Sequence, residues 1–353
     1  MMAKVLMKGN EALAEAAIMA GCKHFFGYPI TPQTELAAYM AKKMPKIGGV
    51  YLQAESEIAA INMVLGASAA GKRAMTSSSS PGISLKAEGI SYIAGSDLPA
   101  VIVNVQRGGP GLGGIQPSQA DYWQATKATG HGDFHLMVYA PSTVQEMMDL
   151  VRLAFDNADK YRMPVMILSD GMLGQMMEPV EIKKEEAAEP IDKPWAACGH
   201  KNKRAHNVVN SLYLTPQALE SLIKERYLKY DQIKKTEQMA DEYMTDDADI
   251  IIVAYGASSR ISRTAVNLAR KEGIRAGLIR PVTLWPYPDS FIEKHISHTK
   301  DFLCVEMSMG QMVDDVKLAV NGRKPVHFYG RTGGIIPSPD EVLQELRKIG
   351  GKI

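Results

Sequence analysis

The sequence predicts an α/β protein of two units, the first built on a parallel sheet covered on both faces and the second a smaller α/β unit. Short apolar runs alternate with longer helical patterns over residues 10–182, and a second alternation begins with an apolar, β-branched run at 249–255. Strands that alternate with helices in this way form parallel sheets. Residues 183–245 separate the units and carry 11 Lys/Arg and 10 Asp/Glu, which is typical of a solvated connector.

The first unit is expected to contain six strands, each a short apolar run, at residues 24–27, 49–53, 73–77, 100–105, 135–140 and 164–169. Helical patterns lie at residues 11–20, 32–43, 56–70, 83–93, 119–128 and 143–157. Thr31 and Pro32 predict the start of the second helix, because a Thr hydroxyl can cap free backbone amides and Pro at the first helical position loses no hydrogen bond.

In the connector, a helix is expected at residues 215–235, while Pro190, Pro194 and Pro216 interrupt the surrounding segment. The second unit should contain strands at residues 249–255, 276–280, 302–306 and 326–329, with one helix that follows the Gly-Ala-Ser-Ser segment at 256–259 and runs to residue 272, and another at 311–321. The predicted division is therefore a first domain at 1–182, a charged, partly helical connector at 183–245 and a second domain at 246–353.

Composition and charge exclude several classes of protein. The 40 Lys and Arg nearly balance the 39 Asp and Glu, so a net charge of +1 creates no field that would draw the chain to nucleic acid or anionic lipid. Cys22, Cys198 and Cys304 lack the spacing of zinc or iron–sulfur ligands, so we expect no metal site built from them, and their odd number fits a reducing compartment. The chain has no signal peptide pattern and no run of roughly 18 apolar residues. These features predict a cytoplasmic protein with no membrane partner.

The first motif, G-Y-P-I-T-P at residues 27–32, follows an expected strand. Ligands bind outside the carboxyl ends of strands in open α/β sheets, so Thr31 is a candidate substrate contact. The alternative is that Thr31 only caps its helix.

The second motif spans residues 53–71 and places Glu55 and Glu57 at the head of an expected helix. After Glu57 no charge occurs until Lys72, and small residues dominate the helix. A helix N-terminus favours an ionised carboxylate, whereas burial favours the protonated form. The alternative is that both are ordinary carboxylates of a first helical turn.

The third motif, at residues 107–114, contains the pattern G-x-G-x-x-G of dinucleotide-binding proteins. We reject that interpretation, since Pro117 interrupts the segment where a phosphate-binding helix should begin and the motif follows the fourth expected strand. The segment is better interpreted as a loop whose Arg107 can form a two-pronged contact with a carboxylate. The alternative for Arg107 is simple solvation.

Together these segments resemble the pyrimidine-binding (alpha) subunit of the 2-oxoacid:ferredoxin oxidoreductases, which are thiamine diphosphate enzymes. The matching segments are residues 27–32, 53–71, 76–82, 104–111, 305–311 and 330–334. The resemblance covers essentially the whole chain. Residues 2–12 are most similar to the branched-chain member of the family, which acts on 3-methyl-2-oxobutanoate.

The resemblance implies a transketolase-like pyrimidine domain, a connector and a transketolase C-terminal-like domain. It also implies that thiamine diphosphate is shared with a beta subunit, which holds the diphosphate and Mg²⁺ through a G-D-G…N motif that we do not find here. A catalytic gamma subunit and a ferredoxin-like subunit with iron–sulfur clusters are the other implied partners. The implied substrates are a 2-oxoacid, coenzyme A and ferredoxin, and this chain would supply half of an active site.

The resemblance also assigns roles to residues. Glu57 matches the acid at N1′ of the aminopyrimidine, with Glu55 as the alternative in register. Thr31 matches the threonine that contacts the substrate, and Arg107 matches the arginine that holds its carboxylate. Tyr28 and Pro29 are expected beside the cofactor.

The loops around this site favour a branched-chain substrate. Over residues 28–34 and 107–119 Arg107 is the only formal charge, whereas the distal carboxylate of 2-oxoglutarate needs a second cation. Ile30, Leu112 and Ile115 offer apolar contacts instead. A 2-oxoglutarate enzyme of the same family, a flavin or nicotinamide oxidoreductase that uses the glycine loop, and a non-catalytic assembly scaffold are the alternatives.

Overall fold

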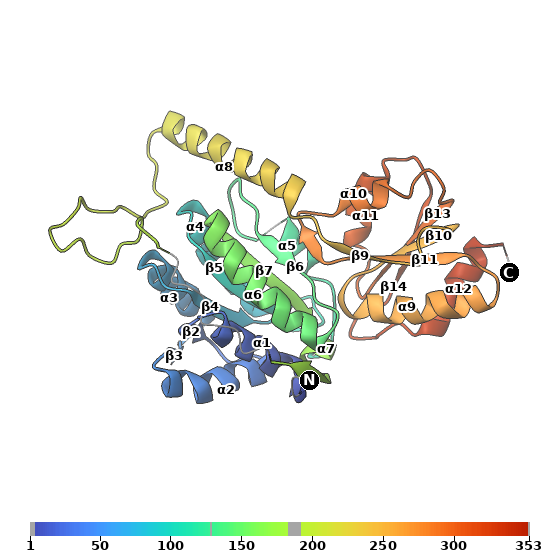
Figure 1. Ribbon diagram of the computed structural model, residues 1–353, viewed down its shortest axis with the longest axis horizontal. Helices are drawn as coiled ribbons and strands as arrows, with labels where there is room; N and C mark the ends of the chain where they lie inside the picture. Colours follow the sequence, from blue (N-terminus) through green and yellow to red (C-terminus); the bar gives the residue numbers. More distant parts are fainter. Residues whose placement is uncertain (1–3, 128, 183–191, 352–353) are drawn as a thin grey trace.

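The structure, a computed structural model, describes residues 4–127, 129–182 and 192–351. Two α/β bodies lie side by side, the first blue to green and the second orange to red (Figure 1). The long helix α8 (Pro216–Thr236) passes over the first body and leads to the second, and it confirms the helix expected in the connector. None of the described helices is both long and apolar enough to cross a membrane.

The first body is built on a seven-stranded sheet of order β12-β6-β7-β5-β4-β2-β3. The strands are β2 (His24–Gly27), β3 (Val50–Gln53), β4 (Ala74–Ser78), β5 (Ala100–Gln106), β6 (Met137–Tyr139), β7 (Pro164–Asp170) and β12 (Thr283–Trp285). All six predicted strands are confirmed and are parallel to one another. The seventh strand, β12, pairs antiparallel with β6 and was not predicted.

The helices of the first body are α1 (Gly9–Met19), α2 (Thr34–Lys43), α3 (Glu57–Ala69), α4 (Ser80–Gly95), α5 (Tyr122–Thr126), α6 (Val144–Tyr161) and α7 (Gly171–Gln175). A 3-10 turn, η1 (Met44–Ile47), follows α2. Helix α1 packs against α2 and α6, and α3 packs against α4. With right-handed crossovers these two groups cover opposite faces of the sheet.

The predicted helix start at Thr31 and Pro32 is wrong. Helix α2 begins at Thr34, and its N-cap residue is Gln33. The chain first closes a turn, in which the Gln33 N–H donates to the Ile30 carbonyl at 3.2 Å. Thr31 lies in this turn with its side chain exposed, so the alternative that it only caps the helix is excluded.

The second body is built on a five-stranded sheet of order β14-β13-β10-β11-β9. Its strands are β9 (Ala240–Tyr243), β10 (Ile250–Val253), β11 (Ala276–Pro281), β13 (Asp301–Glu306) and β14 (Val326–Gly330). Its helices are α9 (Gly256–Lys271), α10 (Asp289–Glu293), α11 (Met312–Val320) and α12 (Pro339–Ile349). The four predicted strands are confirmed as parallel neighbours, and β9 adds an antiparallel edge that we did not predict.

The domain boundaries predicted at residues 182 and 245 stay a prediction. Near residue 245, two strands each join the sheet of the body on the other side of the predicted boundary. Strand β9 precedes residue 245 but belongs to the second sheet, whereas β12 follows that boundary but belongs to the first. A two-stranded antiparallel sheet, β1 (Lys4–Lys8) with β8 (Met177–Glu181), was not predicted, because β1 is largely exposed and lacks a buried apolar run.

Candidate functional site

Four segments meet at the carboxyl edge of the seven-stranded sheet. They follow β2 at residues 28–34, β3 at 54–57, β4 at 79–82 and β5 at 107–119. Because β2, β3, β4 and β5 are parallel, their carboxyl ends lie at one edge, where open α/β sheets bind ligands. The sequence-predicted site residues therefore share one region of the molecule.

Glu57 is the first residue of α3 and is 5% exposed. The Ser56 side chain caps the helix by accepting a hydrogen bond from the Ala59 N–H at 3.2 Å. A Cβ built on Gly82 would overlap the Ser78 hydroxyl and would lie 2.7 Å from Glu57 Oε1. The Glu57 carboxylate therefore lies against the start of α4, at a place that only glycine leaves free. Glu55, the alternative acid, is exposed.

Lys86 of α4 is fully buried near Glu57 and was missed by the sequence analysis. Its ammonium group donates to the Glu57 carbonyl oxygen at 3.4 Å. Burial lowers the pKa of Lys86 to about 8, and the negative charge of Glu57 acts in the opposite direction. The available signal was that Lys86 is the only lysine in the expected helix at residues 83–93. A lysine is almost never fully buried unless it is paired, so its burial points to a partner.

The end of β4 carries buried hydroxyls that lack partners. Among the described residues, none offers a hydrogen bond to the hydroxyl groups of Thr76, Ser78 and Ser79. Buried polar groups in native proteins are nearly always satisfied, so such a cluster indicates a polar ligand or a partner surface. The serine run at residues 77–80, which matched the resemblance, thus lies beside Glu57.

Arg107 follows β5 and is 7% exposed. Its Nη1 donates to the Thr31 carbonyl at 3.0 Å and its Nη2 to the Leu112 carbonyl at 3.2 Å. Its Nε is buried, and no described residue accepts a hydrogen bond from it. Both bonds go to uncharged carbonyl oxygens, and the positive charge of Arg107 acts on the nearby carboxyl of Asp121, where it opposes the burial that raises the pKa of that group. The structure thus brings Arg107 and Thr31 together.

The loop after Arg107 depends on glycine. Gly111 and Gly113 adopt φ values of +67° and +56°, and a Cβ on Gly113 would overlap the carbonyl oxygen of Gly108. Leu112 and Ile115 are 86% and 56% exposed on this loop. Tyr28 and Pro29 are exposed on the neighbouring turn, so the edge combines polar, charged and apolar groups.

The described residues contain no group of three or more His, Cys, Asp or Glu side chains that could hold a metal ion.

Two family models match the chain. One, described as "Pyruvate flavodoxin/ferredoxin oxidoreductase, thiamine diP-bdg", covers residues 15–263, and the other, "Pyruvate:ferredoxin oxidoreductase core domain II", covers residues 248–342. The chain belongs to the pyruvate flavodoxin/ferredoxin oxidoreductase family. It is 48% identical over 350 residues to the ketoisovalerate oxidoreductase subunit VorB of Methanothermobacter thermautotrophicus, and the match covers 99% of each chain. It is 37% identical over 372 residues to the 2-oxoglutarate synthase subunit KorA of Methanothermobacter marburgensis, over 96% of this chain and 97% of the relative.

Solved structures confirm the fold. The chain is similar to the 2-oxoglutarate:ferredoxin oxidoreductase of Magnetococcus marinus, with a TM-score of 0.87 and 28% identity, and the match covers 98% of this chain. The present chain spans 65% of the length of the Magnetococcus marinus chain. A split gene transketolase, 15% identical with a TM-score of 0.61 over 97% of both chains, shares the fold. The predicted transketolase-like architecture of two α/β units is therefore confirmed.

Proposed function

We propose that this chain is the pyrimidine-binding subunit of a thiamine-diphosphate-dependent 2-oxoacid:ferredoxin oxidoreductase that acts on branched-chain 2-oxoacids. The observation that carries the proposal is the buried Glu57 carboxylate, which lies at the carboxyl edge of the sheet beside the unpartnered hydroxyls of Ser78 and Ser79 in a chain of this family. The reaction converts the 2-oxoacid and coenzyme A to acyl-CoA and CO₂, releases a proton and passes two electrons to ferredoxin.

The site residues fit the aminopyrimidine half of the cofactor. Glu57 would exchange a proton with N1′, and the hydroxyls of Ser78 and Ser79 would be polar partners, since no described residue bonds to them. Tyr28 and Pro29 lie on the turn at the same edge and would line the ring. Thiamine diphosphate, when bound, supplies the carbon nucleophile for the 2-oxo group and an acceptor for the electrons of decarboxylation.

Arg107 and Thr31 form the proposed substrate contact. A planar guanidinium binds a carboxylate through two parallel hydrogen bonds, and the guanidinium of Arg107 donates hydrogen bonds only to uncharged carbonyl oxygens in the described chain. Thr31, which lies directly beside Arg107, offers an exposed hydroxyl for the substrate. We propose that Arg107 binds the 1-carboxylate that all 2-oxoacids share.

The remaining partners complete the site. A beta subunit would hold the diphosphate and Mg²⁺, while a catalytic gamma subunit and a ferredoxin-like subunit would carry the further steps and the iron–sulfur clusters. We propose a cytoplasmic location, because Cys22, Cys198 and Cys304 are all free thiols, which fits a reducing compartment.

The preference for a branched-chain substrate rests on two observations. Leu112 and Ile115 present apolar surface on the Arg107 loop. The relatives named as ketoisovalerate oxidoreductase subunits are 47–48% identical to this chain, whereas those named as 2-oxoglutarate synthase subunits are 36–37% identical. Each extra buried methylene contributes about 1–3 kcal/mol of discrimination.

The test is a comparison of kcat/KM for 3-methyl-2-oxobutanoate and for 2-oxoglutarate in the complex assembled with its partner subunits. We expect the higher value for 3-methyl-2-oxobutanoate. A higher value for 2-oxoglutarate would refute the substrate assignment. An assembled complex that turns over no 2-oxoacid, pyruvate included, would refute the oxidoreductase assignment.

A further inference from the structure

Gln119 ends the loop that begins at Arg107, and its side chain is fully buried in the second body. Its Nε2 donates to the Tyr255 carbonyl at 2.8 Å, and its Oε1 accepts from the Ser258 hydroxyl at 2.6 Å and from the Met307 N–H at 3.0 Å. The backbone N–H of Gln119 donates to the Met307 carbonyl at 2.9 Å, and its carbonyl accepts from the Tyr255 hydroxyl at 3.2 Å. Every polar atom of this residue is therefore bound by the second body.

The position of these partners is informative. Tyr255 and Met307 follow β10 and β13, which are neighbouring parallel strands of the five-stranded sheet. The carboxyl edge of such a sheet is where a ligand usually binds. In this chain Gln119 occupies that edge. At Gly256, with φ +53°, a Cβ would lie only 3.1 Å from Gln119 Nε2. The site formed by Tyr255, Ser258 and Met307, called here the socket, therefore fits closely around the side-chain amide.

The loop connects this socket to Arg107. Arg107 forms an antiparallel bridge with Pro117, and the Gly108 N–H donates to the Gln116 carbonyl at 3.0 Å. The returning segment therefore lies directly beside Arg107 and then enters the second body at Gln119. Between its two ends the loop contains glycine at positions 108, 109, 111, 113 and 114. Glycine has no side chain to pack and loses the most conformational freedom on ordering, so the loop is held by its two ends and by internal bonds such as that from the Gly114 N–H to the Gly108 carbonyl at 2.9 Å.

We propose that Gln119 is a positioning residue for the substrate, which holds the Arg107 loop by docking its end into the second sheet. The second body thereby sets the place of a substrate contact that it does not itself provide. The inference rests on the proposed role of Arg107. Gln119 acts through Arg107 and is not itself a catalytic residue.

The test uses the assembled complex and the variant Gln119→Met, which keeps the volume of the side chain and removes its three hydrogen bonds. We expect the KM for the 2-oxoacid to rise about tenfold, which is the order of effect that the loss of one or two net hydrogen bonds supplies. Cofactor activation, followed as proton exchange at C2 of thiamine diphosphate without substrate, should remain within about twofold of the wild type. An unchanged KM would overturn the proposal.

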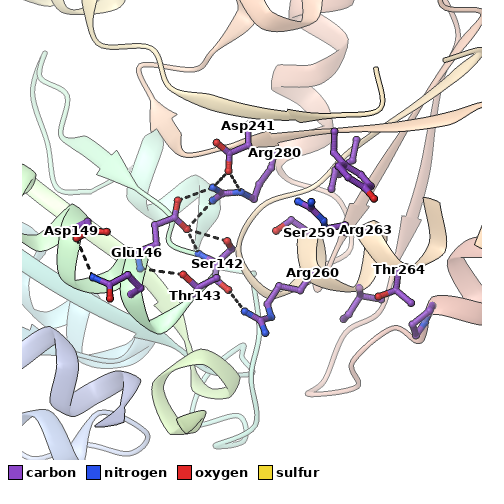
Figure 2. Close-up of a pocket in the computed structure, with 15 residues that line it drawn as sticks. Ser142, Thr143, Glu146, Asp149, Asp241, Ser259, Arg260, Arg263, Thr264 and Arg280 are labelled. Atoms are coloured by element: carbon purple, nitrogen blue, oxygen red, sulfur yellow. Dashed lines mark hydrogen bonds and ion pairs between the residues drawn. The ribbon is translucent and has the colours of Figure 1, made fainter. Parts of the chain in front are cut away.

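The matched control breaks a different link between the two bodies. Arg280 of the second body binds Glu146 of α6 at 2.7 Å and also pairs with Asp241, as Figure 2 shows. These residues line a cleft of about 680 Å³. None of these residues belongs to the Arg107 loop. Arg280→Gln should lower the thermal stability and leave the KM for the 2-oxoacid unchanged. An equal rise in KM in this variant would show that general loosening of the two bodies explains the effect, and would overturn the proposal.

Two further variants keep the result interpretable. Ser258→Ala removes one of the three hydrogen bonds, so it should raise KM in the same direction by about two- to threefold even if Gln119→Met fails to assemble. Arg107→Lys should itself raise KM, because an ammonium cannot reproduce the planar contact. In the Arg107→Lys background, Gln119→Met should add little, since both changes act on one interaction. Independent effects would contradict positioning, whereas a normal KM for Arg107→Lys would refute the proposed role of Arg107.

Discussion

The carboxyl edges of the two sheets differ in how their polar groups are satisfied. At the seven-stranded sheet, Thr76, Ser78 and Ser79 keep buried hydroxyls without a partner in the described chain. At the five-stranded sheet, Glu306 is fully buried, and its carboxylate accepts hydrogen bonds from the first backbone amides of α11 and from a neighbouring hydroxyl. Both edges have the geometry of a ligand site. Among the described residues, the first keeps three buried hydroxyls without a partner, whereas near Glu306 at the second the buried Tyr287 hydroxyl is without one. The larger cluster of unsatisfied polar groups therefore favours the first edge as the proposed site, which the topology alone does not do.

A large loss of activity is expected from filling the slot beside Glu57. In Gly82→Ala, the new methyl group must displace the Ser78 hydroxyl or the Glu57 carboxylate. Misplacing a reacting group by about 1 Å can cost about 100-fold in rate, so we expect kcat/KM of the assembled complex to fall by about 10–100-fold. The overpacking also costs about 1–3 kcal/mol of folding stability, of which the better helix propensity of alanine offsets about 1 kcal/mol.

Gly66→Ala in α3 is the matched control, because nothing lies within 4 Å of its new methyl group. This variant should keep its kcat/KM and gain slightly in thermal stability. Wild-type activity in Gly82→Ala would show that the slot is not part of the site.

Glu306→Gln tests the role of the carboxyl edge of the five-stranded sheet. The variant loses charge-assisted hydrogen bonds to the start of α11, so we expect the free energy of unfolding to fall by about 1–3 kcal/mol. Thermal or denaturant unfolding measures this loss. The rate of C2 proton exchange should be unchanged once the complex is assembled. A selective loss of exchange in a variant of normal stability would give the second edge a chemical role and would erase the contrast.

Another expected effect is a dependence of the free energy of unfolding on pH. Folding lowers the pKa of Lys86 from 10.5 to about 8, so between these values the unfolded chain binds more protons than the folded chain. The contribution of Lys86 to the free energy of unfolding therefore rises with pH across this window, by at most about 1.4 kcal/mol per pH unit. Lys86→Met should remove this rise, as measured by denaturant unfolding at several pH values. The exposed Lys46→Met should leave the wild-type profile unchanged.

The fold could largely be predicted because the buried strands are short apolar runs. Strand β12 was missed because it is three residues long and lies between Pro281 and Pro286. The choice between Glu55 and Glu57 could not be made from their position in the helix, since the burial of Glu57 depends on Gly82 in another helix.

Lys86 and Gln119 were missed as parts of the site for a related reason. Lys86 contacts Glu57 across 29 positions of sequence, and Gln119 contacts Met307 across 188. Local patterns carry no information on such long-range pairs. Local sequence therefore predicted the polar groups near the edge, and the tertiary structure was needed to show how they are held.

Glu57 is the proposed acid at the cofactor. The most direct test is hydrogen–deuterium exchange at C2 of thiamine diphosphate in the assembled complex, measured without substrate for Glu57→Gln and Glu55→Gln. A positioned acid–base group contributes about 10²–10⁴-fold, so Glu57→Gln should slow the exchange by that order, while the exposed Glu55→Gln should leave it near the wild-type rate. Slower exchange in Glu55→Gln than in Glu57→Gln, or equal rates in both, would contradict the account.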